Sequence, residues 1–392
     1  MAKTIGLSGD QAAAYAAKQC DVDVVAAYPI TPQTIIVEEY SNYVADGEVD
    51  SEFICVESEH SAMSACIGAS LTGARVFTAT ASQGLALMHE MLYVASGLRC
   101  PIVMCVANRA LSAPLNIHCD HSDMMGSRDC GWIQVFAENA QEVYDWIIQS
   151  FRFAEDEDVL LPAAVNLDGF TLSHALEDLV VLEDAEVRDF VGVRKPKYWL
   201  TPGKPITVGA AVLPDYYMEI KYQQEDALQR SIMKIREVNE LFEKASGRRY
   251  KAVDTYGLEG AEAAVVCLGS TAGTAKVVSD TLREKGCNVG VVKPWVYRPF
   301  PVEEFLDSVK NVKSLAVLER TISFGAPNGP LFNDVLATLY KAGRQVKVFN
   351  AVYGLGGRDI SPHEMETLMM DAYENIEAEE FDKKVKFIGV RG

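Results

Sequence analysis

Residues 101–110 read PIVMCVANRA, and this stretch decides the fold class. Its strand-forming part is apolar on both faces and ends at the polar pair Asn108 and Arg109. Such a strand is typical of a parallel sheet that helices cover on both sides. Candidate strands of this kind lie at 22–27, 53–56, 76–79, 102–107, 133–136 and 161–167.

Helix-length segments separate these apolar runs. Ser8 and Gln11 form a possible capping box for the first helix, and Asn139 can cap the helix that runs through Trp146. Strands and helices that alternate in this way predict an α/β fold, with a doubly wound parallel sheet as the first domain.

The pattern changes after Ser173. Positions 183–222 are rich in Pro, Tyr and charge, which predicts an extended connection, and apolar residues at helical spacing then predict a helix over 225–246. Alternating strands and helices resume near Glu262 and indicate a second, smaller α/β domain. We therefore expect an α/β domain at 1–182, a linker with its helix at 183–255, and a smaller α/β domain at 256–392.

The composition argues against several classes of protein. A net charge of −19 without a basic run argues against a nucleic-acid binder. No apolar run reaches the length of a membrane span, and the first residues do not resemble a signal peptide, so we expect a cytoplasmic protein without membrane contact. The nine cysteines include no C-x-x-C pair, so we expect neither a disulfide framework nor an iron–sulfur site. Most cysteines should be small buried hydrophobes.

Four polar loops follow the strands of the first domain. In open parallel sheets, ligands bind beyond the carboxyl ends of the strands, so these loops should converge on one edge. The loops are Tyr28–Pro32, Glu57–His60, Ser82–Gly84 and Asn108–Ala110. Two prolines should make the first of them stiff.

Three side chains in these loops could carry chemistry, and each has an alternative structural role. Thr31 either meets a substrate or caps the helix that begins near Pro32. Glu59 either suits the positive end of a helix or is a carboxyl group in a dry cleft, where burial would raise its pKa. Arg109 either clamps a carboxylate bidentately or pairs with a nearby acid.

Two further motifs are weaker signals. His118–Asp123 contains His, Cys and Asp but lacks the regular spacing of structural zinc sites, which favours a polar active-site loop. The glycines within 269–276 and 354–357 fit tight turns as well as phosphate cradles. We expect no metal site on this chain.

Three motifs together resemble one known family. They are YPITPQT (28–34), ESEHSAMSACIGASLTGARVFTATASQGLALM (57–88) and ANRALSAPLNIHCDHSD (107–123). These motifs look like those of pyruvate:ferredoxin oxidoreductases, and most closely like the alpha subunit of the multi-subunit archaeal and bacterial enzymes. The resemblance covers nearly the whole chain. It implies the aminopyrimidine-binding domain of a thiamine-diphosphate enzyme, followed by a transketolase-C-terminal-like domain.

The resemblance also implies a reaction and a catalytic group. Pyruvate and coenzyme A would be converted to acetyl-CoA and carbon dioxide, with reduction of ferredoxin, reversibly in principle. Glu59 matches the family carboxyl group that hydrogen-bonds the aminopyrimidine ring of thiamine diphosphate. The neighbouring cofactor contacts would be Tyr28, Pro29 and Ile30.

Substrate binding is implied for two residues. Thr31 and Arg109 match family residues that hold the substrate carboxylate. A relative that acts on oxalate carries an arginine where Thr31 stands. Thr31 therefore points to pyruvate or another monocarboxylic 2-oxoacid.

The chain lacks parts that the reaction needs. Thiamine-diphosphate enzymes bind the diphosphate through magnesium and a Gly-Asp-Gly motif, and here Leu167-Asp168-Gly169 lacks the first glycine. The Mg²⁺ ion and the [4Fe-4S] clusters are therefore expected on beta, gamma and delta partner subunits of a heterotetramer. Ferredoxin should dock on another subunit, and this chain should be active only within the complex.

Three alternatives stay open. The same chemistry could act on a branched-chain or aryl 2-oxoacid or on 2-oxoglutarate. The chain could be a non-catalytic scaffold subunit of such a complex. A nicotinamide dehydrogenase is a third possibility, although the sequence has no convincing dinucleotide fingerprint.

Overall fold

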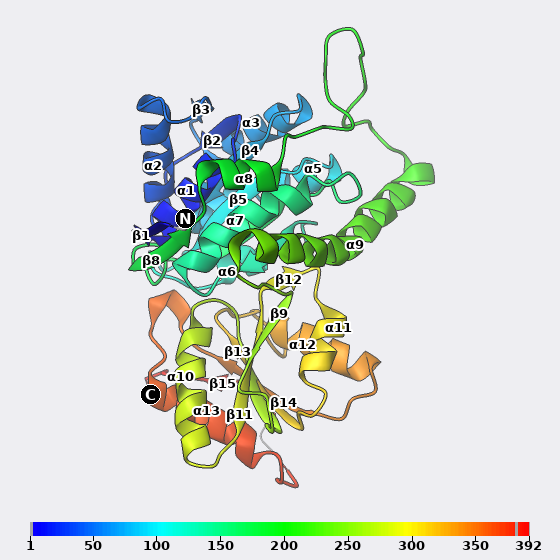
Figure 1. Ribbon diagram of the computed structural model, residues 1–392. Helices are drawn as coiled ribbons and strands as arrows, with labels where there is room; N and C mark the ends of the chain where they lie inside the picture. The colour runs from blue at the N-terminus through cyan, green and yellow to red at the C-terminus, as the bar shows by residue number, and fades with distance from the viewer. Residues whose placement is uncertain (1–2, 381–382, 392) are drawn as a thin grey trace.

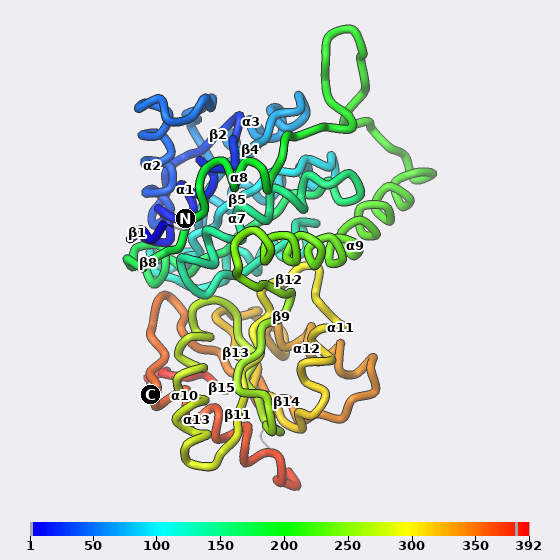
Figure 2. Tube along the Cα trace, viewed as in Figure 1, coloured from blue at the N-terminus to red at the C-terminus, as the bar shows by residue number. Residues whose placement is uncertain are grey.

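The computed structural model describes residues 3–380 and 383–391. Two α/β bodies are stacked on each other: the upper one holds the blue-to-green part of the chain and the lower one the yellow-to-red part (Figure 1). The 33-residue helix α9 (Pro214–Ser246) runs along the first body before the chain enters the second (Figure 2). None of the described helices is both long and apolar enough to cross a bilayer.

A seven-stranded sheet forms the centre of the first body. Its order is β12-β6-β7-β5-β4-β2-β3, and every neighbouring pair is parallel except β12 with β6. The strands are β2 (Val24–Ala27), β3 (Glu52–Cys55), β4 (Val76–Thr80), β5 (Val103–Asn108), β6 (Ile133–Phe136), β7 (Ala163–Asp168) and β12 (Val296–Arg298). All six runs that the sequence predicted as strands are present, which confirms the parallel sheet.

Helices cover both faces of this sheet. They are α1 (Gly9–Gln19), α2 (Thr34–Ala45), α3 (Glu59–Leu71), α4 (Ser82–Leu87), α5 (His89–Gly97), α6 (Ser122–Gly126) and α7 (Ala140–Ala154). The predicted capping box of Ser8 and Gln11 is present, and the side chain of Asn139 accepts a hydrogen bond from Glu142 N at 2.9 Å.

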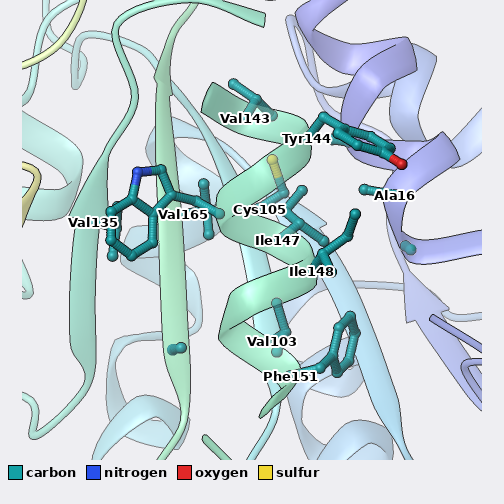
Figure 3. Close-up of a cluster of buried hydrophobic side chains, with 14 of the residues drawn as sticks. Ala16, Val103, Cys105, Val135, Val143, Tyr144, Ile147, Ile148, Phe151 and Val165 are labelled. Carbon is teal, nitrogen blue, oxygen red and sulfur yellow. The ribbon is translucent and has the colours of Figure 1, made fainter. Parts of the chain in front are cut away.

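The central strands are buried on both faces. Ile147 and Phe151 of α7 pack in one cluster with Val103 and Cys105 of β5 (Figure 3). Met104, which lies between these two strand residues, belongs to the cluster on the opposite face. The run therefore has to be apolar at every position, as its sequence indicated.

The second body is built on a six-stranded sheet of order β15-β14-β13-β10-β11-β9. Its strands are β9 (Val253–Tyr256), β10 (Ala263–Val266), β11 (Val289–Pro294), β13 (Ser314–Glu319), β14 (Lys347–Val352) and β15 (Lys386–Phe387). Its helices are α10 (Thr271–Glu284), α11 (Val302–Ser308), α12 (Pro330–Lys341) and α13 (Pro362–Glu374). The predicted second α/β domain is confirmed.

The segment expected to be extended contains helix. α8 (Asp184–Val191) lies within it, and α9 begins at Pro214, well before the predicted start at Glu225. Proline suits a first helical turn because its missing N–H would be unpaired there in any case. The buried residues of α9 start only at Gln224, so the apolar periodicity that reveals a helix is absent from its first turns.

Two strand pairings were not foreseen. β1 (Lys3–Ser8) and β8 (Leu176–Val181) form a small antiparallel ribbon. β12 follows β11 of the second body in sequence but pairs with β6 of the first sheet. The chain of the second body therefore also completes the first sheet.

A buried polar cluster joins the two bodies. Asp168, the last residue of β7, accepts hydrogen bonds from Arg320 Nη1 (2.8 Å) and from the backbone N–H of Ser270 (3.1 Å). His121 Nε2 lies 2.7 Å from its other oxygen. Burial alone would raise the pKa of Asp168, but the charges of Arg320 and His121 outweigh it and hold that pKa far below its usual range. The ionised carboxylate of Asp168 therefore binds groups of both bodies at the contact between them, which we call the seam.

Replacing Asp168 by Ala should lower the free energy of unfolding by about 3–5 kcal/mol, because the buried charge of Arg320 would lose its carboxylate. Urea unfolding of both proteins measures the loss. The control is Glu303→Ala, which removes an exposed partner of Arg236 and should cost at most about 1 kcal/mol. Equally small losses in the two variants would contradict the role given to Asp168.

Candidate active site

The loops after β2, β3, β4 and β5 meet at the edge of the first sheet that faces the second body. β7, whose last residue contacts Arg320, ends at the same edge. β2 lies between β3 and β4, so the order of the strands reverses there. In open parallel sheets a crevice at such a reversal is the usual ligand site.

The loop after β2 is held in place by Gln33. Its amide nitrogen donates to a backbone carbonyl of β4 at 2.9 Å, and its amide oxygen accepts from Ile30 N at 3.0 Å. α2 begins at Thr34 with Gln33 at the cap position, so Thr31 is not the helix cap, and that alternative for it is wrong. Thr31 and Tyr28 are exposed at the edge.

Glu59 begins α3 shortly after β3, and the residue is only 6% exposed. Ser58 caps this helix, since its hydroxyl accepts a hydrogen bond from Ser61 N at 3.3 Å. Within the described part of the chain, no hydrogen bond reaches the carboxylate of Glu59. The position suits the helix dipole, and a carboxyl group that no protein donor binds is available to a ligand.

The loop after β4 closes over this carboxylate. A Cβ atom at Gly84 would lie 2.7 Å from Glu59 Oε1 and 2.6 Å from Thr80 Oγ1, so the loop needs glycine at this point. The Thr80 hydroxyl is buried and has no partner among the described residues, and the same holds for Gln83 Nε2. Next to the Glu59 carboxylate, these unpaired groups are available to bind a ligand.

Sequence reasoning missed Thr80. Its only signal was its place as the last residue of β4, directly before the loop Ser82–Gly84 that was singled out.

Arg109 joins two loops and has no acidic partner. Its Nη1 donates to Thr31 O at 2.8 Å, and its Nε donates to Asn116 O at 3.1 Å. Among the residues that the structure describes, no carboxylate lies within ion-pair distance of the guanidinium, so the ion-pair alternative is wrong. The residue is 7% exposed, and burial lowers the pKa of its guanidinium, an effect that Asp123 offsets only in part. A buried guanidinium held only by neutral carbonyls is prepared for an anion.

Asp123 fixes the backbone around Arg109. Its carboxylate accepts hydrogen bonds from Arg109 N (2.9 Å), Ser82 N (3.0 Å) and the amide of Asn108 (2.9 Å). Burial raises the pKa of Asp123, and these three donors counteract the rise. The loops after β4 and β5 are therefore tied to one buried group. The sequence placed Asp123 in a polar loop without indicating this role.

The glycine-rich segments are turns that pack against the first body. Gly356 and Gly357 have positive φ and approach Asn116 and His118 closely. Gly357 N also donates to Cys119 O at 2.6 Å. In this structure both glycines serve the contact between the bodies, which favours the interpretation as tight turns.

Cys119, His121 and Asp168 bring ligand atoms within 4.8 Å of one another. The guanidinium of Arg320 is bonded to this carboxylate, so a cation is already present. Burial raises the pKa of the Cys119 thiol well above its usual value, which keeps it protonated. A metal needs deprotonated ligands, so the cluster fits a structural link better than a metal site.

Family models match both bodies. The description "Pyruvate flavodoxin/ferredoxin oxidoreductase, thiamine diP-bdg" matches residues 15–240, more than half of the chain. The description "Pyruvate:ferredoxin oxidoreductase core domain II" matches residues 261–365.

Curated relatives are similar over almost their full length. Pyruvate synthase subunit PorA of Methanocaldococcus jannaschii is 51% identical, covering 93% of this chain and 93% of the relative. The subunit of the same name from Thermotoga maritima is 49% identical, covering 99% and 98%. Ketoisovalerate oxidoreductase subunit VorA of Pyrococcus horikoshii is 44% identical, covering 97% and 96%.

Two solved structures share the fold. The 2-oxoglutarate:ferredoxin oxidoreductase of Magnetococcus marinus aligns with a TM-score of 0.74 at 19% identity, covering 95% of this chain and 65% of that one. This chain therefore spans just under two thirds of that structure's length. A split-gene transketolase aligns with a TM-score of 0.55 at 12% identity, covering 94% and 99%. At these identities the likeness concerns the fold alone.

Two buried arginines offer a matched test of the site. Arg75 is paired with Glu155 through two 2.9 Å hydrogen bonds, whereas Arg109 has no carboxylate partner among the described residues. Arg75→Met should cost about 3–5 kcal/mol of unfolding free energy, because it leaves Glu155 buried and unpaired. Arg109→Met should cost about 1 kcal/mol. Urea unfolding measures both, and an equal loss at Arg109 would mark it as a structural residue.

Proposed function

The chain belongs to the pyruvate:ferredoxin oxidoreductase family, and on that premise we propose that it supplies one half of a thiamine-diphosphate-dependent active site. In the proposed reaction, pyruvate and coenzyme A yield acetyl-CoA and carbon dioxide, and two electrons pass to ferredoxin. The relatives named pyruvate synthase subunit PorA, 51% and 49% identical to this chain, support pyruvate as the substrate. The resemblance carried by the three sequence motifs is confirmed at the level of the family.

Arg109 is the observation that carries this proposal. The residue is buried, its guanidinium has no ion-pair partner among the described residues, and it reaches the backbone of Thr31. In the proposed site it binds the carboxylate of the 2-oxoacid, and the exposed Thr31 hydroxyl adds a hydrogen bond to the same group. The substrate then supplies the ion-pair partner that the guanidinium lacks, so binding offsets an electrostatic cost of the free protein.

The space around Glu59 fits the aminopyrimidine ring of thiamine diphosphate. An unbonded carboxylate and the unpaired Thr80 hydroxyl can bond nitrogen groups at the edge of such a ring. The loop after β2 would contact the cofactor through Tyr28, Pro29 and Ile30. When bound, the cofactor supplies a centre that accepts the electrons of the breaking carbon–carbon bond. Glu59, a residue that is 6% exposed, would hold or share one proton at a ring nitrogen.

The rest of the site is assigned to partner subunits. We propose that the Mg²⁺ ion, the diphosphate anchors and the [4Fe-4S] clusters lie on beta, gamma and delta subunits of a heterotetramer. In this chain the incomplete motif at Asp168 supports the assignment, because Arg320 and Ser270 already bond its carboxylate. Ferredoxin would dock on another subunit, and coenzyme A would bind at a site completed there. The proposed location is cytoplasmic, with these soluble reactants.

We also propose the bounds of three segments of the chain, each matched to a role. Residues 1–182 form the aminopyrimidine-binding domain, 183–255 connect it to the next, and 256–392 form the transketolase-C-terminal-like domain. The family models support this order, since they match 15–240 and 261–365.

One relative favours a second substrate. Ketoisovalerate oxidoreductase subunit VorA is 44% identical to this chain over 97% of its length, so a branched-chain 2-oxoacid is the second candidate. Initial rates of the purified complex with pyruvate and with ketoisovalerate separate the two, because the larger side chain has to fit beside Thr31.

Glu59→Gln in the complete complex should lower kcat for pyruvate by about 10²–10⁴-fold, since an amide cannot share the proton. The KM for pyruvate should stay close to the wild-type value, because Arg109 still holds the carboxylate. Glu57→Gln is the matched control: this neighbouring glutamate is exposed, and its replacement should leave kcat unchanged. Unchanged turnover in Glu59→Gln would favour the scaffold alternative.

A further inference from the structure

A small cavity lies at the amino ends of the central strands, at the edge of the first sheet away from the candidate active site. Pro101 and Leu160, which line it, come shortly before β5 and β7. The chain that leaves α8, green in Figure 1, forms another wall, and Leu200 N in this segment donates to Leu71 O at 2.7 Å. The cavity has a volume of about 100 Å³, which suits a molecule of a few heavy atoms.

Two half-buried arginines of this cavity lack an acidic partner. Arg99 donates to the carbonyl groups of Leu160 (3.0 Å) and Val159 (2.5 Å). Arg194 donates from Nη2 to Ser70 O at 3.4 Å, while its Nη1 is buried without a hydrogen bond. Among the residues that the structure describes, no carboxylate lies within ion-pair distance of either guanidinium. Burial lowers the pKa of both groups, which are therefore available to an anion.

The acid with the largest effect on Arg194 is already bound elsewhere. Both oxygens of Glu155 accept hydrogen bonds from Arg75, at 2.9 Å each. Glu155 counteracts the effect of burial on the pKa of Arg194 only in part. Lys197, which also lines the cavity, is paired with Glu157 at the surface. The cavity therefore keeps an excess of positive charge, although the chain has a net charge of −19.

The other walls of the cavity are mainly apolar. The apolar lining residues are Leu71, Leu98, Pro101, Leu160, Pro196, Trp199, Ile206 and Val208. A phosphate ion would turn several charged oxygens toward these groups, which is unfavourable. A carboxylate has only two oxygens, which a guanidinium group can bind together, and an attached hydrocarbon chain gains from contact with apolar walls. The lining therefore fits a small acid with an apolar chain better than it fits phosphate.

We propose that this cavity binds the carboxylate of a small aliphatic acid. Arg99 and Arg194 hold the carboxylate, which supplies the ion-pair partner that both guanidinium groups lack. The short hydrocarbon chain packs against Leu71, Leu98 and Trp199. This site is separate from Arg109 and does not depend on the proposed function.

Two elements join the cavity to the candidate active site. α3 begins at Glu59 and ends at Leu71, beside the cavity. β5 starts shortly after Pro101 and ends at Asn108, next to Arg109. A bound acid therefore stabilises the two elements that carry the active-site groups.

Calorimetric titration of butyrate into the purified complex tests the proposal, with Arg109→Met present so that the substrate position does not compete. One butyrate should bind per copy of this chain, with a Kd of about 1 mM or lower. Adding Arg194→Met should weaken binding by about tenfold or more, and adding Arg99→Met should do the same, because each change removes one guanidinium. Butyramide, the neutral analogue, should not bind.

Lys195→Met is the matched control, because Lys195 is exposed and is not among the lining residues, and it should leave the Kd for butyrate unchanged. Urea unfolding without butyrate should show no loss of stability in Arg194→Met, since no carboxylate loses an ion-pair partner. A clear loss would mark Arg194 as a structural residue and overturn the proposal.

The titrations can contradict the proposal in four further ways. Butyrate that does not bind saturably would overturn it, as would an unchanged Kd in both arginine variants. Equal binding of butyramide would show that the charge is not recognised. Inorganic phosphate that binds more tightly than butyrate would show a phosphate site in place of the proposed one.

Discussion

The shared carboxylate of Asp168 is the contact on which the arrangement of the two bodies depends. It ends the central strand β7, binds Arg320 and Ser270 of the second body, and lies against His121 of the first. Charged groups in such a dry place are stable only while each has its partner, so the contact specifies one relative position of the bodies. Gly169 follows directly, and a Cβ there would lie 2.8 Å from Pro32. The seam is therefore continuous with the loop that carries Thr31.

The candidate site contrasts with this satisfied cluster. Arg109 lacks a carboxylate, and the carboxylate of Glu59 and the hydroxyl of Thr80 lack hydrogen bonds, all within the described part of the chain. Unpaired charged groups and unpaired hydroxyl groups both lower the stability of the fold. A rigid frame therefore has to keep them in place without protein partners. Asp123 and Gln33 provide that frame by binding the backbones of the surrounding loops. The polar groups around Asp168 are paired with one another, whereas Arg109, Glu59 and Thr80 at the sheet edge keep unpaired groups. A site that other molecules complete requires such unpaired groups.

Much of this arrangement could be predicted from the sequence. Apolar runs such as 102–107 predicted the strands, because a strand that is buried on both faces has no position that suits a polar side chain. The order of strands and loops then brought Thr31 and Arg109 to one edge, and the structure joins them by a hydrogen bond. All cysteines except Cys55 and Cys287 are buried, as expected.

The remainder depends on contacts between residues far apart in the chain. The bond between Asp168 and Arg320 spans 152 positions, and no local pattern encodes it. Gly84 and Thr80 matter only because Glu59 lies beside them in space. The first turns of α9 could not be recognised, since they do not pack on the body and so carry no helical periodicity.

The central claim is that this chain holds only half of the cofactor site. Calorimetric titration of thiamine diphosphate with Mg²⁺, into the purified chain and into the complete complex, tests it most directly. The account predicts binding by the complex and no binding by the chain alone up to about 1 mM, a limit that corresponds to roughly 4 kcal/mol of binding free energy. Binding of comparable strength by the isolated chain, with oxidation of pyruvate, would contradict the claim.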